Sequence, residues 1–277
     1  MTDIPLRQLN DGSTLPAIGL GTYGLTGEDG IAAIGAGIAS GYRLLDTALN
    51  YGNEREVGEA IRRSGVDRDE FVVTSKLPGR HHGYEETLAS FEESRKNLGL
   101  ERIDLYLIHW PLPRIGKFVD SFRAFLKLRE DGLVRSAGVS NFTEAQLRRI
   151  VLETGVAPAV NQVELHPHFP QAALRKVHEE LGIVTESWAP LGKRQELLDE
   201  PVVQDAASAH GVTPTQAVLR WHLELGAVPV PKSGDAERQR ENLGVFGFTL
   251  TGDEVSAFSA LESGRLWDGD PETHEEF

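Results

Sequence analysis

Polar and charged side chains follow nearly every short apolar run in this sequence. They are Asp46, Lys76, His109, Ser140, Asn141, Gln162, Glu164, Glu186, Trp188, Lys232 and Ser233. Carboxylates, amines and imidazoles transfer protons in enzymes when the fold brings them within hydrogen-bond reach of a reacting group. The sequence therefore indicates an acid–base site, provided that the apolar runs form elements that bring these side chains close together in the fold.

The apolar runs have the length and composition of buried strands. They are short, rich in β-branched residues and bounded by turn residues, as strands of a parallel sheet are. They cover Leu44–Leu45, Phe71–Val73, Leu105–Ile108, Leu133–Val134, Val156–Val163, Ile183–Val184 and Val228–Val230.

Helices are predicted between these strands. Their ends are marked by glycines, which readily adopt the left-handed conformation that closes a helix: Gly41, Gly65, Gly99, Gly132, Gly155, Gly182, Gly211 and Gly226. Their starts are marked by pairs with capping-box spacing: Asn53 with Glu56, Thr143 with Gln146, Thr213 with Gln216, and Thr251 with Glu254.

Helices and strands thus alternate from about residue 28 to residue 243, which predicts a parallel sheet with right-handed crossovers, either open or closed into a barrel. In a closed barrel the carboxyl ends of all strands converge on one face, where catalytic residues gather. Because no linker divides the chain, we expect a single domain over residues 1–277. Its acidic, irregular tail, from about residue 263, is expected to lie flexibly over the active site.

Composition narrows the function classes. The chain has 277 residues, with 28 Lys and Arg against 42 Asp and Glu, a net charge of −14. This charge disfavours nucleic acid, which requires clustered basic residues. The chain shows no signal peptide and no stretch of ~18 apolar residues that would span a membrane. We therefore expect a soluble, cytoplasmic protein without a nucleic-acid or membrane partner.

No metal site is expected. The sequence has no cysteine, which excludes thiolate ligands and disulfides. The histidines of His81-His82 and His166-Pro167-His168 are too close in sequence to converge on one ion, and no carboxylate spacing completes a site.

One glycine-rich segment offers an alternative fold, an open, doubly wound sheet that binds a dinucleotide. Residues 19–24 match the pattern G-x-G-x-x-G, and Asp46 follows about 20 residues later, as in a dinucleotide-binding fingerprint. However, Pro16 interrupts the preceding strand, and Leu25-Thr26-Gly27 delays the helix that should begin within the glycine loop. This context argues against an open, doubly wound sheet.

Three ordered motifs resemble those of the aldo-keto reductases. The first runs from Gly41 to Gly58 and contains Asp46-Thr47-Ala48 and Tyr51, although Leu44 replaces a frequent His. The second runs from Leu133 to Phe142, and the third includes Val230-Pro231-Lys232-Ser233 with Arg238, Glu241 and Asn242. The resemblance as a whole extends over residues 19 to about 262. The segments around Arg80, Gln162 and Trp188 are most similar to bacterial diketogluconate-reductase-type members.

The resemblance implies a (β/α)8 TIM barrel that reduces aldehydes and ketones with NADPH. It also implies that Asp46, Tyr51, Lys76 and His109 form the catalytic tetrad. A phenol with a pKa near ~10 is a weak acid at neutral pH unless its anion is stabilised. In this interpretation Tyr51 is the general acid, Lys76 stabilises its anion, Asp46 keeps Lys76 charged, and His109 orients the carbonyl oxygen.

Cofactor residues are also implied by the resemblance. Ser140, Asn141 and Gln162 would bind the nicotinamide carboxamide, Trp188 would stack on its ring, and Lys232, Ser233 and Arg238 would clamp the 2′-phosphate. Glu241 and Asn242 would lie toward the adenine. The remaining positions that match cofactor-binding sites are Gly21, Thr22, Asp46, Ala189, Pro190, Leu191 and Gly192. Asp235 stands where close relatives often carry a basic residue, so NADH remains a weaker alternative.

The substrate pocket is less well defined by the resemblance. Candidate substrate-binding residues are Tyr23, Tyr51, His109, Trp110 and Trp267. Pro78 stands where many relatives place a tryptophan, which removes an aromatic wall. We expect small polar carbonyl compounds, including dicarbonyls and keto-sugars, and a monomeric enzyme.

Two other functions stay open at this point. One is a cofactor-binding regulatory subunit on the same barrel, for which an intact tetrad without turnover would be evidence. The other is a lyase or isomerase that forms a Schiff base on Lys76.

Overall fold

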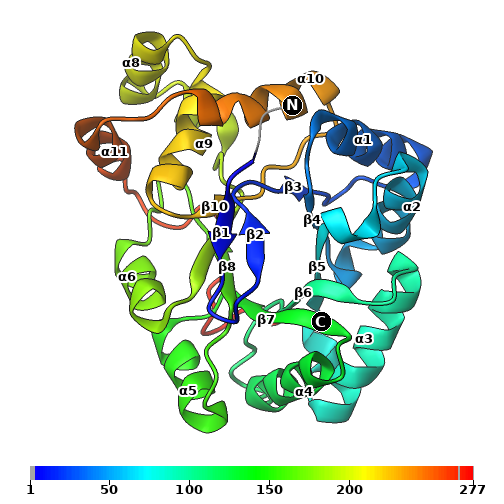
Figure 1. Ribbon diagram of the computed structural model, residues 1–277. Helices are drawn as coiled ribbons and strands as arrows, with labels where there is room; N and C mark the ends of the chain where they lie inside the picture. Colours follow the sequence, from blue (N-terminus) through cyan, green and yellow to red (C-terminus); the bar gives the residue numbers. More distant parts are fainter. Residues whose placement is uncertain (1–3, 268, 277) are drawn as a thin grey trace.

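The computed structural model describes residues 4–267 and 269–276. Within these residues, an eight-stranded parallel sheet follows the chain order without interruption (Figure 1). Its strands are β3 (Leu20–Gly21), β4 (Leu44–Asp46), β5 (Val72–Leu77), β6 (Ile103–Ile108), β7 (Val134–Ser140), β8 (Val160–Glu164), β9 (Val184–Trp188) and β10 (Val228–Pro229).

Helices surround this sheet on the outside (Figure 1). They are α1 (Gly27–Ser40), α2 (Glu54–Ser64), α3 (Tyr84–Leu98), α4 (Phe118–Glu130), α5 (Glu144–Thr154), α6 (Ala172–Leu181), α7 (Arg194–Leu198), α8 (Pro201–His210), α9 (Pro214–Glu224), α10 (Ala236–Leu243) and α11 (Gly252–Ser259). The predicted alternation of strand and helix is confirmed, and all eight of the glycines predicted to end helices have positive φ.

The sheet closes into a barrel where β3 meets β10. Gly19 N donates to Pro229 O at 3.0 Å, and Gly21 N donates to Pro231 O at 3.1 Å. A Cβ on Gly21 would lie 2.8 Å from the backbone oxygen of Val230, so glycine permits this close approach of two backbones. Gly19 and Gly21 therefore serve barrel closure, and the alternative of a dinucleotide fingerprint on an open sheet is wrong.

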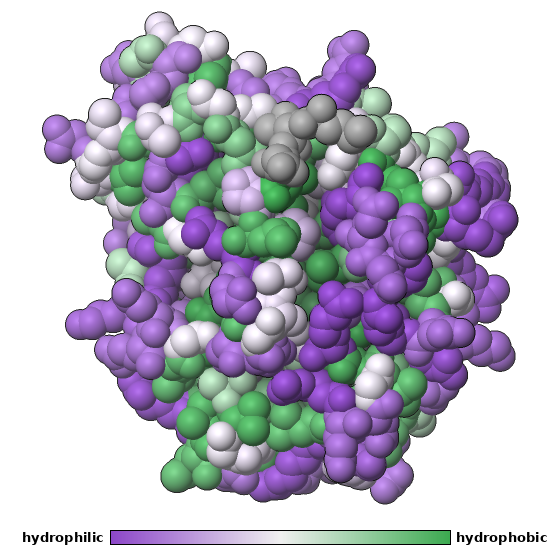
Figure 2. Space-filling model, viewed as in Figure 1, coloured by the Kyte–Doolittle hydropathy of each residue, from purple (hydrophilic) through white to green (hydrophobic). Residues whose placement is uncertain are grey.

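A short antiparallel hairpin, which sequence reasoning did not predict, covers one end of the barrel. Its strands are β1 (Leu6–Gln8) and β2 (Thr14–Pro16), and Figure 1 views the barrel from this end. Leu9 and Leu15 are buried in one cluster with residues of the barrel strands, such as Leu105 and Val228. On the same face, hydrophilic side chains dominate the surrounding helices and apolar side chains show between them (Figure 2). The site must therefore open at the other end.

Two local predictions need correction. Asn53 precedes α2, but its side chain makes no capping hydrogen bond there, whereas Thr143, Thr213 and Thr251 form the predicted capping boxes. The strand predicted from Val156 begins only at Val160. Pro158, which has no N–H to donate to a sheet, lies in the segment before it.

The packing of α2 against the end of α3 gives a stability prediction. A Cβ on Gly58, in the middle of α2, would lie 1.9 Å from the backbone oxygen of Leu98. We expect Gly58→Ala to lower the free energy of unfolding by about 2–3 kcal/mol, because neither backbone can yield without cost. Urea denaturation measures this change.

Gly35→Ala in α1 is the matched control. No atom lies within 4 Å of a Cβ built on Gly35. Alanine there should raise the free energy of unfolding by about 0.5–1 kcal/mol, since it removes backbone entropy from the unfolded chain. Equal effects of the two substitutions would contradict the packing argument.

Candidate active site

A cavity of about 470 Å³ opens at the carboxyl ends of the barrel strands. It collects side chains that are far apart in sequence, as expected for the catalytic face of such a barrel. Its lining residues are Gly21, Thr22, Tyr23, Asp46, Tyr51, His109, Trp110, Asn141, Gln162, Trp188, Ala189, Pro190, Val230, Lys232 and Trp267. The predicted convergence of polar strand-end residues is thus observed.

Lys76 lies at the base of this site and is fully buried. Its Nζ donates to Asp46 Oδ1 at 2.7 Å and to the backbone oxygen of Thr47 at 2.9 Å. Gln162 Nε2 donates to the other Asp46 oxygen at 2.8 Å. Burial alone would lower the pKa of Lys76, but the charge and hydrogen bond of Asp46, together with the neighbouring Tyr51 and Glu186, outweigh it and raise that pKa above its ordinary value. Lys76 therefore stays charged.

Tyr51 ends a short 3-10 helix, Leu49–Tyr51, after β4. Its hydroxyl lies 3.4 Å from Lys76 Nζ. Burial raises the pKa of Tyr51 above its ordinary value, while the charge of Lys76 acts in the opposite direction. The lysine is thus placed to stabilise a phenolate, but in this structure desolvation has the larger effect.

A second buried carboxyl, Glu186, lies on β9 next to Gln162 on β8. Burial and the charge of Asp46 raise the pKa of Glu186 to about 8. Its carboxyl is therefore largely protonated at neutral pH, which limits the negative charge around Asp46. Sequence reasoning noted Glu186 as a strand-end residue but assigned it no role.

His109 follows β6 and faces Tyr51, with ring centroids 5.8 Å apart at nearly a right angle. Asn141 Nδ2 donates to the backbone oxygen of His109 at 3.0 Å. The ring Nδ1 of His109 lies 2.6 Å from Oε1 of Glu276, in the tail. The tail also covers Trp110, whose ring lies 4.1 Å from that of His274. Sequence reasoning did not predict a tail carboxylate in this place.

An amide-rich wall lies beside these residues. Asn141 adopts φ 63° and accepts a hydrogen bond from Trp188 Nε1 at 2.8 Å. The Ser140 hydroxyl, which is buried, donates to the backbone oxygen of Gln162 at 2.8 Å. Asn141, Gln162 and Trp188 line the cavity here, whereas Ser140 lies behind them.

A second, smaller cavity of about 250 Å³ shares Lys232 with the first. Its other lining residues are Leu191, Thr215, Ser233, Gly234, Asp235, Arg238, Glu241 and Asn242. Lys232 and Arg238 bring positive charge to it, and the buried Asn242 Oδ1 makes no hydrogen bond within the described residues. Such a cavity suits a phosphate at one end and a hydrogen-bonding ring at the other.

Comparisons with known proteins agree with this geometry. The sequence profile of the Aldo/keto reductase family matches residues 17–263. The chain belongs to this family. It is 61% identical to 2,5-diketo-D-gluconic acid reductase B of a Corynebacterium species, over the whole of both chains.

Solved structures of the family have the same fold. A mutant of Gox0644 in complex with NADPH is 41% identical over 99% of this chain and 100% of its own, with a TM-score of 0.94. An aldo-keto reductase of Bombyx mori in complex with NADP is 33% identical over 97% of this chain and 96% of its own, with a TM-score of 0.91.

In this aldo/keto reductase Asn53 has a structural role that its capping-box spacing did not predict. Its Nδ2 donates to the backbone oxygens of Thr22 and Leu25 at 2.7 and 3.0 Å. Its Oδ1 accepts from Thr47 Oγ1 at 2.8 Å. Asn53 therefore ties the loop after β3 to the loop after β4, where the cavity residues Thr22 and Asp46 lie.

Three predicted residues lie outside the linings of both cavities: Lys76, which is fully buried, and two cofactor candidates. Ser140 is buried behind Gln162, and a Cβ on Gly192 would lie 3.3 Å from Leu266 at the start of the tail. Trp267 does line the main cavity and meets Trp188 edge-on, with ring centroids 5.6 Å apart. The remaining predicted cofactor and substrate residues line one cavity or the other.

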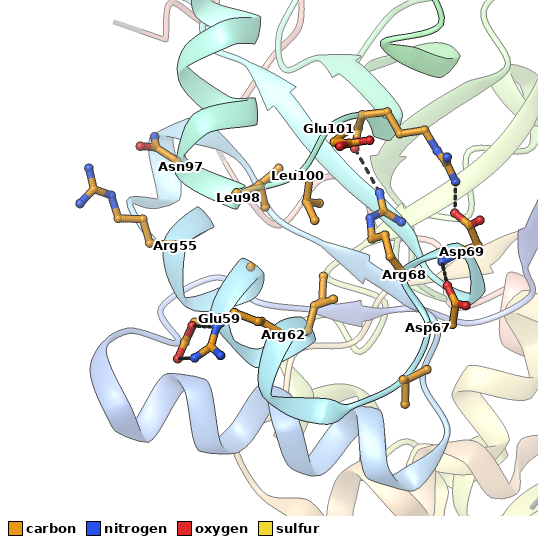
Figure 3. A pocket seen from close by; sticks show the side chains of 15 residues that line it. Arg55, Glu59, Arg62, Asp67, Arg68, Asp69, Asn97, Leu98, Leu100 and Glu101 are labelled. Carbon is orange, nitrogen blue, oxygen red and sulfur yellow. Dashed lines mark hydrogen bonds and ion pairs between the residues drawn. The ribbon is translucent and has the colours of Figure 1, made fainter.

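Another groove of this aldo/keto reductase, of about 730 Å³, lies elsewhere, between α2 and the segments that precede β5 and β6 (Figure 3). Arg62 pairs with Glu59, and Arg102 pairs with Asp69. The groove thus sits at the amino ends of the strands, opposite the catalytic face, and these arginine charges are compensated. We assign it no catalytic role.

No group of three or more His, Asp or Glu side chains is arranged to hold a metal ion within residues 4–267 and 269–276. None of the helices in that part of the chain is both long and apolar enough to cross a membrane.

Proposed function

We propose that this protein reduces aldehydes and ketones to alcohols with NADPH, and that Tyr51 is the general acid. The observation that carries this proposal is the buried chain from Gln162 through Asp46 and Lys76 to Tyr51, which ends in the same cavity as His109. The identity with a diketogluconate reductase and the NADPH complex of a similar protein support it.

The two cavities fit the proposed cofactor. When bound, NADPH supplies the hydride that converts the carbonyl carbon to an alcohol carbon. Asn141, Gln162 and Trp188 would hold its nicotinamide end. Lys232, Ser233 and Arg238 would hold its 2′-phosphate. The buried Asn242 Oδ1, which has no hydrogen-bond partner among the described residues, can accept a hydrogen bond from the adenine amino group.

Tyr51 donates its hydroxyl proton to the carbonyl oxygen as negative charge develops there. Lys76 stabilises the phenolate that remains, and Asp46 keeps this fully buried lysine charged. His109 orients the carbonyl oxygen by hydrogen bonding. The same buried pairing disfavours a Schiff base on Lys76, because that chemistry needs a neutral, accessible amine.

The substrate would enter between aromatic side chains. Tyr23 is 66% exposed and lies edge-on to Tyr51, with ring centroids 5.0 Å apart. Trp110 and Trp267 complete this part of the lining. We propose small polar carbonyl compounds as substrates, including dicarbonyls and keto-sugars. If the protein reduces no carbonyl compound, the alternative function is that of a cofactor-binding regulatory subunit.

The binding of NADPH tests the cofactor assignment. We expect NADPH to quench tryptophan fluorescence, because Trp188 lines the cavity beside the nicotinamide residues, and to bind more tightly than NADH. Asp235 weakens this preference, since its carboxylate accepts from the N–H groups of Glu237 and Arg238 at the start of α10. The N–H of Arg238 holds the pKa of Asp235 below its ordinary value, so the charge persists.

Asp235→Asn keeps a capping side chain and removes the charge, so it should increase the NADPH preference about threefold. Glu237→Gln is the control, because it removes an exposed acid from the same helix turn without touching the cap. Equal shifts in the two variants would reject a specific effect of Asp235. Failure of wild-type protein to bind either nucleotide would overturn the proposed function.

The remaining expectations are also proposals. We propose that residues 1–277 form one domain that works as a cytoplasmic monomer, with its tail from about residue 263 over the active site. Sedimentation analysis of the active protein tests the monomer.

A further inference from the structure

The tail places one carboxylate at the edge of the active site. Glu276 Oε1 lies 2.6 Å from His109 Nδ1 and accepts from Asn50 Nδ2 at 2.6 Å. Its other oxygen, Oε2, accepts from the backbone N–H of Gly79 at 3.2 Å. The Glu276 side chain is only 13% exposed. A carboxylate is therefore held by three separate groups of the barrel.

Two of these groups, the Asn50 amide and the Gly79 N–H, donate hydrogen bonds to Glu276, and the His109 ring lies within ion-pair distance of it. The guanidinium of Arg80 donates to Asn50 Oδ1, which turns the amide NH₂ of Asn50 toward Glu276. At position 79 only glycine fits, because a Cβ there would lie 2.2 Å from the backbone oxygen of Glu276. The barrel thus places N–H donors of Asn50 and Gly79, with the positive charge of Arg80 nearby, around the Glu276 carboxylate. An anion requires such an arrangement.

The electrostatics of Glu276 agree with this description. Burial alone would raise the pKa of Glu276, but the hydrogen bond and charge of His109, with Asn50 and the Gly79 N–H, lower it below its ordinary value. The surroundings therefore stabilise a carboxylate rather than a carboxylic acid. Since His109 also lines the cavity proposed for the carbonyl substrate, this position adjoins the reaction site.

We propose that Asn50, the Gly79 N–H and His109 form a carboxylate-binding subsite, which Glu276 fills until the carboxylate of an oxo-acid substrate displaces it. The exchange leaves every donor satisfied, because one carboxylate replaces another. A neutral carbonyl compound cannot replace Glu276 in this way. The proposal rests on the proposed function and narrows its substrate class to carbonyl compounds that carry a carboxylate.

Glu276 competes with the substrate in this arrangement, because its tether gives it a high effective concentration at the subsite. Glu276→Ala should therefore raise kcat/KM for oxo acids by about tenfold relative to their methyl esters. The pairs to compare are pyruvate with methyl pyruvate, and 4-oxopentanoate with methyl 4-oxopentanoate. Glu275→Ala is the matched control, since Glu275 pairs with the exposed Arg114 and makes no contact with His109 among the interactions described.

A binding measurement tests whether the carboxylate subsite exists, without requiring catalytic turnover. Calorimetric titration with butyrate should show affinity for Glu276→Ala about tenfold higher than for wild-type protein, and butyramide should bind neither. Adding Asn50→Ala to Glu276→Ala should remove most of this gain. Thermal denaturation of each variant checks that the barrel remains folded.

The outcomes of these experiments distinguish a failure of the carboxylate subsite from a failure of the proposed reductase function. A gain in Glu276→Ala that persists without Asn50 would overturn the subsite, because Glu276 would then act only by repelling anions. Equal butyrate affinity in wild-type protein and Glu276→Ala would also overturn it. Failure of every variant to reduce both acids and esters would instead overturn the proposed reductase function, while the butyrate titration would still decide the subsite.

Discussion

Tyr51→Phe is expected to lower kcat for carbonyl reduction by about 10²–10⁴-fold, the usual contribution of a positioned general acid. The substitution removes the hydroxyl that lies 3.4 Å from Lys76 Nζ and keeps the ring that packs against Tyr23 and His109. Shape and cofactor contacts should therefore be preserved. Single-turnover kinetics at saturating NADPH measure the chemical step directly.

Tyr23→Phe provides the matched control for this experiment. Tyr23 lines the same cavity and loses the same atom, but its hydroxyl makes none of the described hydrogen bonds to Lys76. We expect kcat to change less than about threefold in this variant, because it leaves the proton donor in place. If Tyr51→Phe reduces substrate at an undiminished rate while NADPH still binds, the role proposed for Tyr51 is wrong.

Lys76→Met should damage both activity and stability. The substitution leaves Asp46, which is 3% exposed, with a buried charge and no cation. Removing one partner of a buried ion pair costs about 3–5 kcal/mol, so we expect a loss of this size in the free energy of unfolding. Without the positive charge, the Tyr51 phenolate loses its stabilisation, and kcat should fall by about 10²-fold or more.

A double variant separates the two effects. Asp46→Asn combined with Lys76→Met removes the orphaned charge, so it should recover much of the lost stability while activity stays low. Urea denaturation and initial-rate kinetics on the same preparations provide both readings. Wild-type stability in Lys76→Met alone would show that the buried pair does not hold this part of the barrel together.

The barrel and its catalytic face could be predicted because they depend on repeated local signals. Each strand is a short apolar run, and each of the eight glycines predicted to end a helix has positive φ, which a residue without Cβ adopts freely. Asp46, Lys76 and His109 were found because each follows such a run. The strand order then brings them together without any further information from the sequence.

Other features could not be predicted because their causes are not local. Asn53 has the spacing of a helix cap, yet its amide bridges two loops that become neighbours only in the folded barrel. The β1–β2 hairpin is too short to show a pattern. Glu276 lies in an acidic tail without periodicity, and its partners Asn50 and Gly79 are some 200 residues away.

The closure of the barrel has a consequence for synthesis in the cell. Gly21 joins the β10 side of the barrel through Pro231, so β3 keeps an unpaired edge until that segment has left the ribosome. At about 5–20 residues per second this interval lasts roughly 10–40 s. During it, the edges of β3 and of the growing sheet are open to pairing with other chains. We therefore expect the nascent protein to depend on chaperones, or on slow folding of its first segments, more than a protein whose strand edges pair early in synthesis.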